Sequence, residues 1–152
     1  MLSALLLPLA ACSADEVTLP DVDVAPDERA ACQSLVDALP TDLGDDRERV
    51  PVLPADGLGA AWGDPAIVMT CGGDAPELSR TAPCTEANGV GWYVDEAVIA
   101  DESVAASLVA AGYRPIVTLE VPPDQRPEGA AAAMAGLASA VREHAQLVQP
   151  CL

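Results

Sequence analysis

The chain has 152 residues, of which 51% are hydrophobic, and this length fits one domain with a modest core. Its seven basic residues are all arginine and stand against 24 acidic residues, so the formal net charge is −17 at pH 7. A field of this sign repels phosphate backbones, which argues against nucleic acid as a partner.

The N-terminal residues 1–11 are apolar apart from Ser3 and end in Leu-Ala-Ala before Cys12. Spanning a bilayer takes about 20 apolar residues, so this run is too short for an anchoring helix. The pattern resembles a bacterial lipobox, in which the cysteine carries a diacylglyceryl group. We interpret residues 1–11 as a lipoprotein signal peptide and Cys12 as the lipid attachment site. The alternative is a buried N-terminal helix with an incidental cysteine.

Residues 13–28 carry six carboxylates and no basic side chain, and Pro20 and Pro26 interrupt any regular element. This composition predicts an extended, solvated tether over residues 12–28. A flexible chain of the 20 residues from Cys12 to Cys32 has a root-mean-square span of about 25 Å. Residues 29–152 would then form a single domain close to the outer face of the membrane.

Two stretches have helical periodicity. Residues 27–39 place apolar side chains at i, i+3, i+4 and i+7, and Pro40 ends the pattern. Residues 127–149 form a second predicted helix, which begins at Pro127 and is stopped by Pro150. The apolar stripes are Cys32, Leu35, Val36 and Leu39 on the first helix, and Met134, Leu137, Val141, His144 and Val148 on the second.

Four stretches read as strands: residues 50–53 at an edge, 65–71 in the centre, 90–94, and 116–121. Residues 72–89 are expected to be a loop, with Asn88-Gly89 as a turn. Residues 103–111 fit either a strand or a helix by propensity. These elements predict an α+β fold, an antiparallel sheet of about four strands with two helices packed on one face.

The sequence predicts neither a metal site nor a cofactor. The acidic loop that holds Asp42, Asp45 and Asp46 lacks the alternating ligand pattern of a calcium loop. Zinc would need a C-x-x-C pair or several histidines, and the chain has one histidine. Gly72-Gly73 is best read as a plain turn.

Four cysteines remain after Cys12: Cys32, Cys71, Cys84 and Cys151. An even number in an exported chain predicts two disulfides. Three pairings are open, and closeness in the sequence favours Cys71 with Cys84. Cys32 and Cys151 would then join the start of the first helix to the end of the second.

The order of these motifs resembles the actinobacterial family called domain of unknown function 3515, which consists of uncharacterised secreted proteins and lipoproteins. The resemblance covers residues 31–152. It implies an envelope location and a strand before Tyr113, and it implies no activity. The matching residues are Cys32, Leu35, Leu39, Pro40, Trp62, Gly63, Pro65, Cys71, Gly72, Cys84, Trp92, Tyr113, Arg114, Pro115 and Pro122.

Two functions are compatible with the sequence. The first is a non-catalytic envelope lipoprotein, held to the outer face of the cytoplasmic membrane, that binds an envelope protein or a small ligand. Aromatic residues and arginine are enriched at binding hot spots, so its surface candidates are Trp62, Trp92, Tyr113 and Arg114. The alternative for both tryptophans is a place in the core.

The second function is a small hydrolase that uses His144 with a carboxylate or a serine. No G-x-S-x-G motif accompanies this histidine. Because His144 lies on the apolar stripe of the last helix, the sequence favours a buried, hydrogen-bonded side chain. No catalytic residue is therefore assigned.

Overall fold

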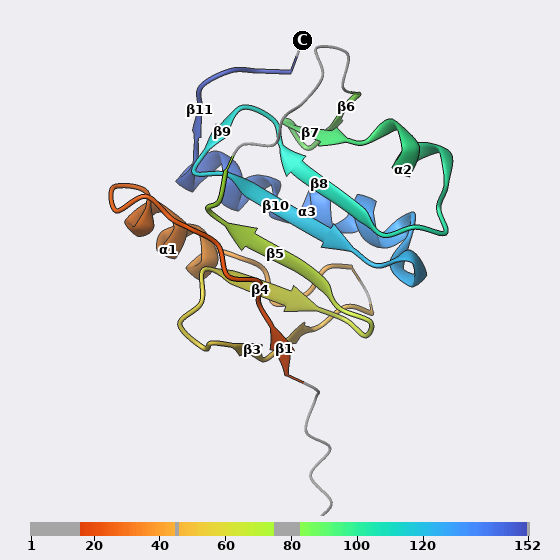
Figure 1. Cartoon of the computed structure of the whole chain (residues 1–152), viewed down its shortest axis with the longest axis horizontal. Coiled ribbons are helices and arrows are strands. Elements are labelled where there is room, and N and C mark those ends of the chain that lie inside the picture. Colours follow the sequence, from red (N-terminus) through yellow and green to blue (C-terminus); the bar gives the residue numbers. More distant parts are fainter. Residues whose placement is uncertain (1–15, 45, 75–82, 152) are drawn as a thin grey trace, which may run out of the picture.

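A computed structural model of the chain describes residues 16–44, 46–74 and 83–151. Seven strands form one antiparallel sheet in the order β2-β4-β5-β10-β8-β7-β6 (Figure 1). The sheet has more strands than the four that the sequence predicts. In sheet order, the strands are β2 (Arg49–Val50), β4 (Gly59–Trp62), β5 (Ile67–Cys71), β10 (Val117–Val121), β8 (Ala106–Ala110), β7 (Val90–Val94) and β6 (Cys84–Ala87).

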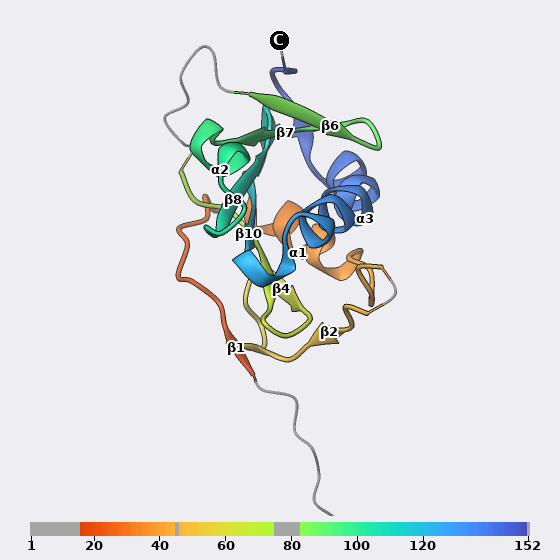
Figure 2. The ribbon, with the colours of Figure 1, turned by 90° about the vertical axis from the view of Figure 1, so that its right-hand side faces the viewer.

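Two helices, α1 (Arg29–Asp37) and α3 (Glu128–His144), pack against each other and cover one face of the sheet (Figure 2). We call this the helix face, and the other side the open face. The core lies between the sheet and these helices. A third, short helix, α2 (Glu96–Ala100), lies toward the open face, so the predicted α+β class is correct but two helices understate the fold.

Alternation along the strands decides which side chains enter this core. In β5, Ile67, Met69 and Cys71 are fully buried toward the helix face, while Val68 and Thr70 point to the open face. In β7, the same alternation buries Trp92 between two buried valines. Both strands were predicted, and the structure confirms them.

Two strands of the sheet were not predicted. The residues of β4 are Gly-Ala-Ala-Trp, of which only the tryptophan favours a strand, yet all four are buried between β2 and β5. Strand β6 lies within the predicted loop and forms a hairpin with β7. Its turn at Asn88 and Gly89 is confirmed, because both residues have positive φ, 49° and 82°, as a two-residue hairpin loop requires.

The ambiguous residues 103–111 contain a strand and no helix. Strand β8 pairs with β10 on one side and with β7 on the other, so tertiary pairing outweighs the helical propensity of its alanines. The chain from α2 to β8 is held by Arg126, which donates hydrogen bonds to three of its backbone carbonyls. The carbonyls belong to Val98 (2.7 Å), Asp101 (2.8 Å) and Val104 (2.9 Å). Arg126 directly follows the short 3-10 helix η1 (Pro123–Gln125).

The acidic segment before α1 is part of the domain, which corrects the prediction of a flexible tether. Strand β1 (Val17–Thr18) pairs in parallel with β3 (Val52–Leu53), and Leu19 is only 7% exposed. The backbone N–H of Gly73 donates to the carbonyl of Asp23 at 2.7 Å. Ordering this segment costs conformational entropy, and the backbone hydrogen bonds to β3 and Gly73 help to offset that cost. Residues 1–15, which include Cys12, lie outside the described residues.

The last helix ends at His144, five residues before the predicted end. The chain then forms β11 (Gln146–Leu147), which pairs with β9 (Tyr113–Arg114). The backbone N–H groups of Val148 and Gln149 both donate to the Gly112 carbonyl, so they are not available to a helix. Val148 is 58% exposed and does not belong to the buried stripe.

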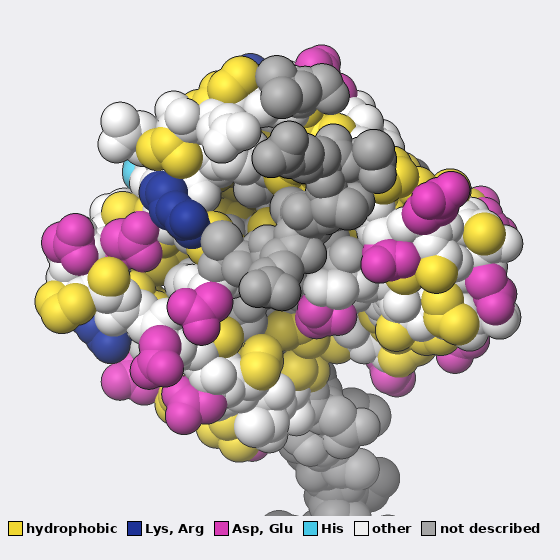
Figure 3. Space-filling view, turned by 45° about the horizontal axis from the view of Figure 1, so that its top comes forward, with side chains coloured by type: hydrophobic (Ala, Val, Ile, Leu, Met, Phe, Trp, Pro, Cys, Tyr) yellow, Lys and Arg dark blue, Asp and Glu magenta, His cyan; other side chains and the backbone are white. Residues whose placement is uncertain are grey.

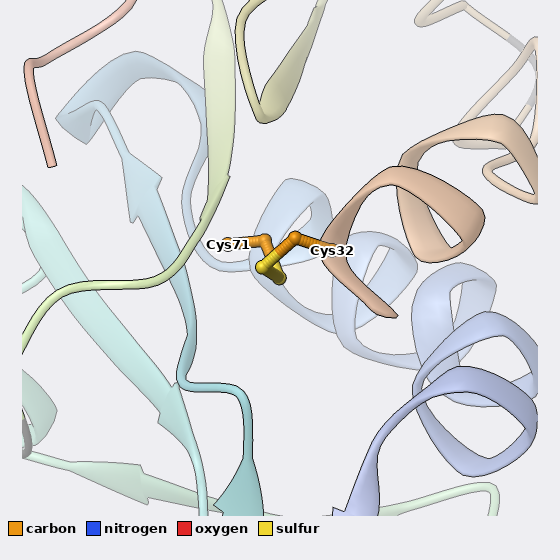
Figure 4. The surroundings of a disulfide bond; sticks show 2 residues. All are labelled: Cys32 and Cys71. Atoms are coloured by element: carbon orange, nitrogen blue, oxygen red, sulfur yellow. A yellow bond between two sulfur atoms is a disulfide. The ribbon is translucent and has the colours of Figure 1, made fainter. Parts of the chain in front are cut away.

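The four cysteines form two disulfides, but the predicted pairing is wrong. Cys32 on α1 bonds to Cys71 at the end of β5, with a Cα–Cα distance of 5.5 Å (Figure 4). Cys84 bonds to Cys151, with a Cα–Cα distance of 6.2 Å.

The sheet itself prevents the predicted pair of Cys71 and Cys84. Cys71 points to the helix face, where it meets α1. Cys84 is the cross-strand partner of Tyr93, whose neighbour Trp92 points to the helix face, so Cys84 and Tyr93 point to the open face. Moreover, β5 and β6 are separated by three strands of the sheet.

Candidate functional site

A cavity of about 440 Å³ opens beside the N-terminal segment, on the open face of the sheet. Residues 19–24 and residues 54–58 supply most of its wall, and Thr70 of β5 supplies a polar group from the sheet. We call it the Thr70 cavity. It is lined by Leu19, Pro20, Asp21, Val22, Val24, Arg29, Pro54, Asp56, Gly57, Leu58 and Thr70.

Two glycines allow the N-terminal segment to lie close to the sheet. A Cβ atom at Gly57 would lie 2.7 Å from Leu19 Cδ1, and one at Gly59 would lie 3.2 Å from it. At Gly59 the added atom would also collide with the Met69 carbonyl oxygen. Leu19 therefore packs directly over the backbone of this region, and this packing sets the position of the cavity wall.

Thr70 is the main polar group from the sheet. It is 7% exposed and, apart from Tyr113, carries the only buried hydroxyl in the described part of the chain. Its hydroxyl forms no hydrogen bond with another described residue, whereas its backbone pairs with Gly59 and Thr118 on the neighbouring strands. Because Thr70 lines the cavity, its hydroxyl can donate to or accept from a bound molecule.

Three charged side chains stand at the rim of the cavity. Asp21 belongs to the N-terminal segment, Asp56 to the turn after β3, and Arg29 to the first turn of α1; all three are exposed. Two carboxylates and one guanidinium give this wall a net negative charge. Acidic side chains also outnumber arginines on the side of the molecule that Figure 3 shows.

The predicted surface patch is not formed, because three of its four members are buried. Trp62 and Trp92 are 0% exposed and Tyr113 is 5% exposed, while Arg114 is exposed. The alternative, that both tryptophans belong to the core, is confirmed. Only Arg114 remains available at the surface, and it is not among the residues of the Thr70 cavity.

His144, the candidate for a hydrolase, is the last residue of α3 and is only partly buried. Helix α3 packs on the helix face, whereas the Thr70 cavity lies on the open face. The structure therefore does not bring His144 to this cavity. Its ring forms no hydrogen bond with another described residue, in contrast to the expectation of a hydrogen-bonded histidine.

Five of the eleven residues of the cavity were missed because the sequence analysis assigned them to a tether. A signal was present: Val17 and Leu19, then Val22 and Val24, alternate with polar residues or proline. Such alternation is typical of an extended segment with one face on a protein surface. The high acidity of the segment concealed this pattern.

Other features of the described residues add no second site. Within residues 16–44, 46–74 and 83–151, no group of three or more histidine, cysteine or acidic side chains could hold a metal ion. No described helix is long and apolar enough to cross a membrane.

Comparison with known proteins gives one match. The family model described as "Protein of unknown function (DUF3515)" matches residues 1–150. The searches of curated proteins and of solved structures found no match.

Proposed function

The chain belongs to the DUF3515 family of proteins of unknown function, and we propose that it is an extracytoplasmic lipoprotein that binds a small ligand in the Thr70 cavity without catalysis. The observation that carries the proposal is the cavity itself. Its volume of about 440 Å³ falls within the range of small-molecule sites, roughly 300 to 1,000 Å³. Its wall presents apolar side chains beside Asp21, Arg29, Asp56 and Thr70, so a ligand would meet apolar and polar surface in about equal parts.

The proposed location rests on two features of the sequence and one of the fold. Residues 1–11 and Cys12 resemble a lipobox, and a diacylglyceryl group supplies the two acyl chains that stable attachment requires. The two disulfides support an oxidising compartment, where such bonds persist. On this proposal Cys12 lies only five residues before β1, so the domain would sit directly at the membrane.

A hydrolase that uses His144 has less support. A general base must reach its substrate within hydrogen-bonding distance or through one water molecule. His144 ends a helix on the face opposite the cavity. No observation among the described residues supplies it with a nucleophile.

Ligand-observed and protein-observed NMR with a library of small fragments tests the binding function. We expect fragments to shift the backbone amide signals of Leu58 and Thr70 in the full domain. Val22→Trp adds bulk to a partly exposed wall residue and should abolish these shifts, whereas Val36→Trp on α1, outside the cavity, should leave them unchanged. A library that leaves both amides unshifted would contradict the proposal.

Complementation in cells that lack the native copy tests the same proposal in vivo. Val22→Trp should abolish function at a normal protein level, and His144→Gln, which keeps size and hydrogen bonding, should preserve it. The hydrolase becomes the better hypothesis if His144→Gln alone removes function from a folded protein.

Attachment at Cys12 is tested by metabolic labelling with a fatty-acid probe. The wild type should be labelled and Cys12→Ser should not. Equal labelling of both proteins would rule out lipidation at this residue.

A further inference from the structure

We infer that the Thr70 cavity selects a small organic ammonium compound, with a primary amine beside an apolar body of about dipeptide size. This inference rests on the proposed binding function and specifies the chemical class of the ligand. Three features of the wall carry it: its charge, its apolar surface and the hydroxyl of Thr70.

The charge of the wall favours a cation over an anion. Asp21 and Asp56 come from the two segments that line the cavity, so its wall carries two carboxylates, and the single charge of Arg29 offsets only one of them. The whole chain, with a formal charge of −17, adds a field of the same sign. Such a field raises the local concentration of cations and their association rate.

The apolar part of the wall favours a ligand with a hydrocarbon body. Leu19 is buried, and Val24 and Leu58 are partly buried against the core, so these side chains are held in place by packing. Apolar atoms placed against them leave water, at about 25 cal/mol for each Å² removed. A small inorganic cation would gain nothing from this surface, whereas an amine with a hydrocarbon body would.

Thr70 supplies a neutral acceptor to the same cavity as the two carboxylates. Its backbone groups are used in the sheet, and its hydroxyl forms no hydrogen bond with another described residue. An ammonium group has three donors and no acceptor, so one hydroxyl oxygen and two carboxylates match its hydrogen-bonding capacity. An anion would meet the same three groups as acceptors, and only the Thr70 hydroxyl proton and the Arg29 guanidinium would donate to it.

Four probes that differ only at their ends test this selectivity by isothermal titration calorimetry. Leucyl-leucinamide carries a free amine, leucyl-leucine is a zwitterion, N-acetyl-leucyl-leucinamide is neutral, and N-acetyl-leucyl-leucine is an anion. We expect the first to bind most tightly, and acetylation of its amine to weaken binding at least about tenfold, which corresponds to about 1.4 kcal/mol. The anion should bind weakest of the four.

Matched variants assign the selectivity to the cavity. The double variant Asp21→Asn with Asp56→Asn should reduce the preference for leucyl-leucinamide over its acetylated form to less than about threefold. The control Asp37→Asn with Asp124→Asn makes the same change in net charge at exposed sites outside the cavity, and should keep the preference. Thr70→Val, which keeps the shape of the side chain, should weaken the amine and spare the neutral probe.

Several results would overturn the inference. One is equal or tighter binding of the acetylated probes, and another is an equal loss of preference in both double variants, which would assign the effect to the general field. Absence of binding by all four probes would overturn it as well. In that case, neutral fragments that still shift the Leu58 and Thr70 amides would leave the proposed binding function intact.

Discussion

The indole nitrogen of Trp62 donates a hydrogen bond to the backbone carbonyl of Pro40, with an N···O distance of 3.0 Å. Pro40 follows the loop that ends α1, and Trp62 ends β4, so this bond joins the first helix to a strand of the sheet. Trp92 offers a contrast. It is equally buried, yet its indole nitrogen has no hydrogen-bond partner among the described residues.

This contrast predicts different costs for the same substitution at the two tryptophans. Trp62→Phe and Trp92→Phe remove a similar buried volume, but only the first leaves a carbonyl without its partner. We expect Trp62→Phe to lower the free energy of unfolding by about 1 to 3 kcal/mol more than Trp92→Phe. Urea denaturation, followed by the fluorescence of the remaining tryptophan, measures both. An equal or larger loss in Trp92→Phe would contradict the assigned hydrogen bond.

The two disulfides should differ in their sensitivity to reductant. Cys32 and Cys71 are 0% exposed, whereas Cys84 and Cys151 are partly exposed. Because exchange requires access to a sulfur atom, a limiting phosphine reductant should open Cys84–Cys151 first. Differential alkylation with peptide mapping detects the order. Equal reduction of both bonds, or a peptide that joins Cys71 to Cys84 in the untreated protein, would contradict the structure.

Gly91 should be required for the Cys84–Cys151 bond. A Cβ atom at this position would collide with the Sγ atom of Cys151 and lie 3.1 Å from that of Cys84. Gly91→Ala should therefore leave free thiols and destabilise the fold, by up to the roughly 4 kcal/mol that closing a loop of this size contributes.

The same substitution in a protein without the Cys84–Cys151 bond separates the collision with sulfur from any other effect of alanine at position 91. In the variant Cys84→Ser with Cys151→Ser, Gly91→Ala should have little effect on the free energy of unfolding, because the bulky sulfur pair is gone. The assay is a thiol count together with urea denaturation. An equal cost in both backgrounds would assign the effect to the backbone of β7 instead.

Asp101 should stabilise the turn after α2 in a pH-dependent way. The Ser103 hydroxyl and then the Ser103 backbone N–H, at 2.6 and 2.9 Å, together with the charge of Arg126, hold the pKa of the Asp101 carboxyl below its ordinary value of 3.8. Because the folded pKa is lower than the unfolded one, the stabilisation is fully present above 3.8 and is lost as the pH falls through the folded pKa.

Carboxyl-carbon NMR measures this directly. The titration midpoint of Asp101 should lie below 3.8, and Ser103→Ala should raise it. The difference in melting temperature between the wild type and Asp101→Asn should be constant near neutral pH and shrink below that value. A midpoint at or above the ordinary pKa would contradict the hydrogen-bonded geometry.

The sequence predicted the strands whose own residues show an apolar run or an alternation of buried and exposed positions. The apolar run at Ile67 and the alternation around Trp92 are local properties, and both are correct. Strand β4 is small and poor in β-branched residues, and it becomes a strand because β2 and β5 pair with it. Nothing within Gly59–Trp62 contains that information.

The disulfide pairing failed for a related reason. Closeness in the chain joined Cys71 to Cys84, but strand alternation sends them to opposite faces of the sheet. The face of Cys71 could have been predicted, since it shares the parity of Ile67 and Met69. The strand that holds Cys84 was read as a loop, so its face could not.

The Thr70 cavity as a whole could not be predicted, because its walls come from two segments that are far apart in the sequence. One wall was read as a solvated tether, and its order comes from backbone pairing with β3, which composition does not report. The need for glycine at positions 57 and 59 is also visible only in the folded structure, where Leu19 packs against them.

The pairing of β1 with β3 gives the domain a weak point under tension. The backbone N–H groups of Val17 and Leu19 hold this end of the chain, by hydrogen bonds of 2.9 and 2.8 Å. Because these bonds are few and lie at the amino end, a pull from a lipid on Cys12 would unzip them one after another. Peeling would stop at Cys32, which is bonded to Cys71 in the core.

The peeled length would include residues 19–24, which form one wall of the Thr70 cavity. From Cys12 to Val17 the chain spans at most about 18 Å, so little slack separates a lipid anchor from this wall. If Cys12 carries the proposed lipid, tension on it would open the cavity while the sheet stays folded, and occupancy of the proposed ligand site would depend on mechanical load.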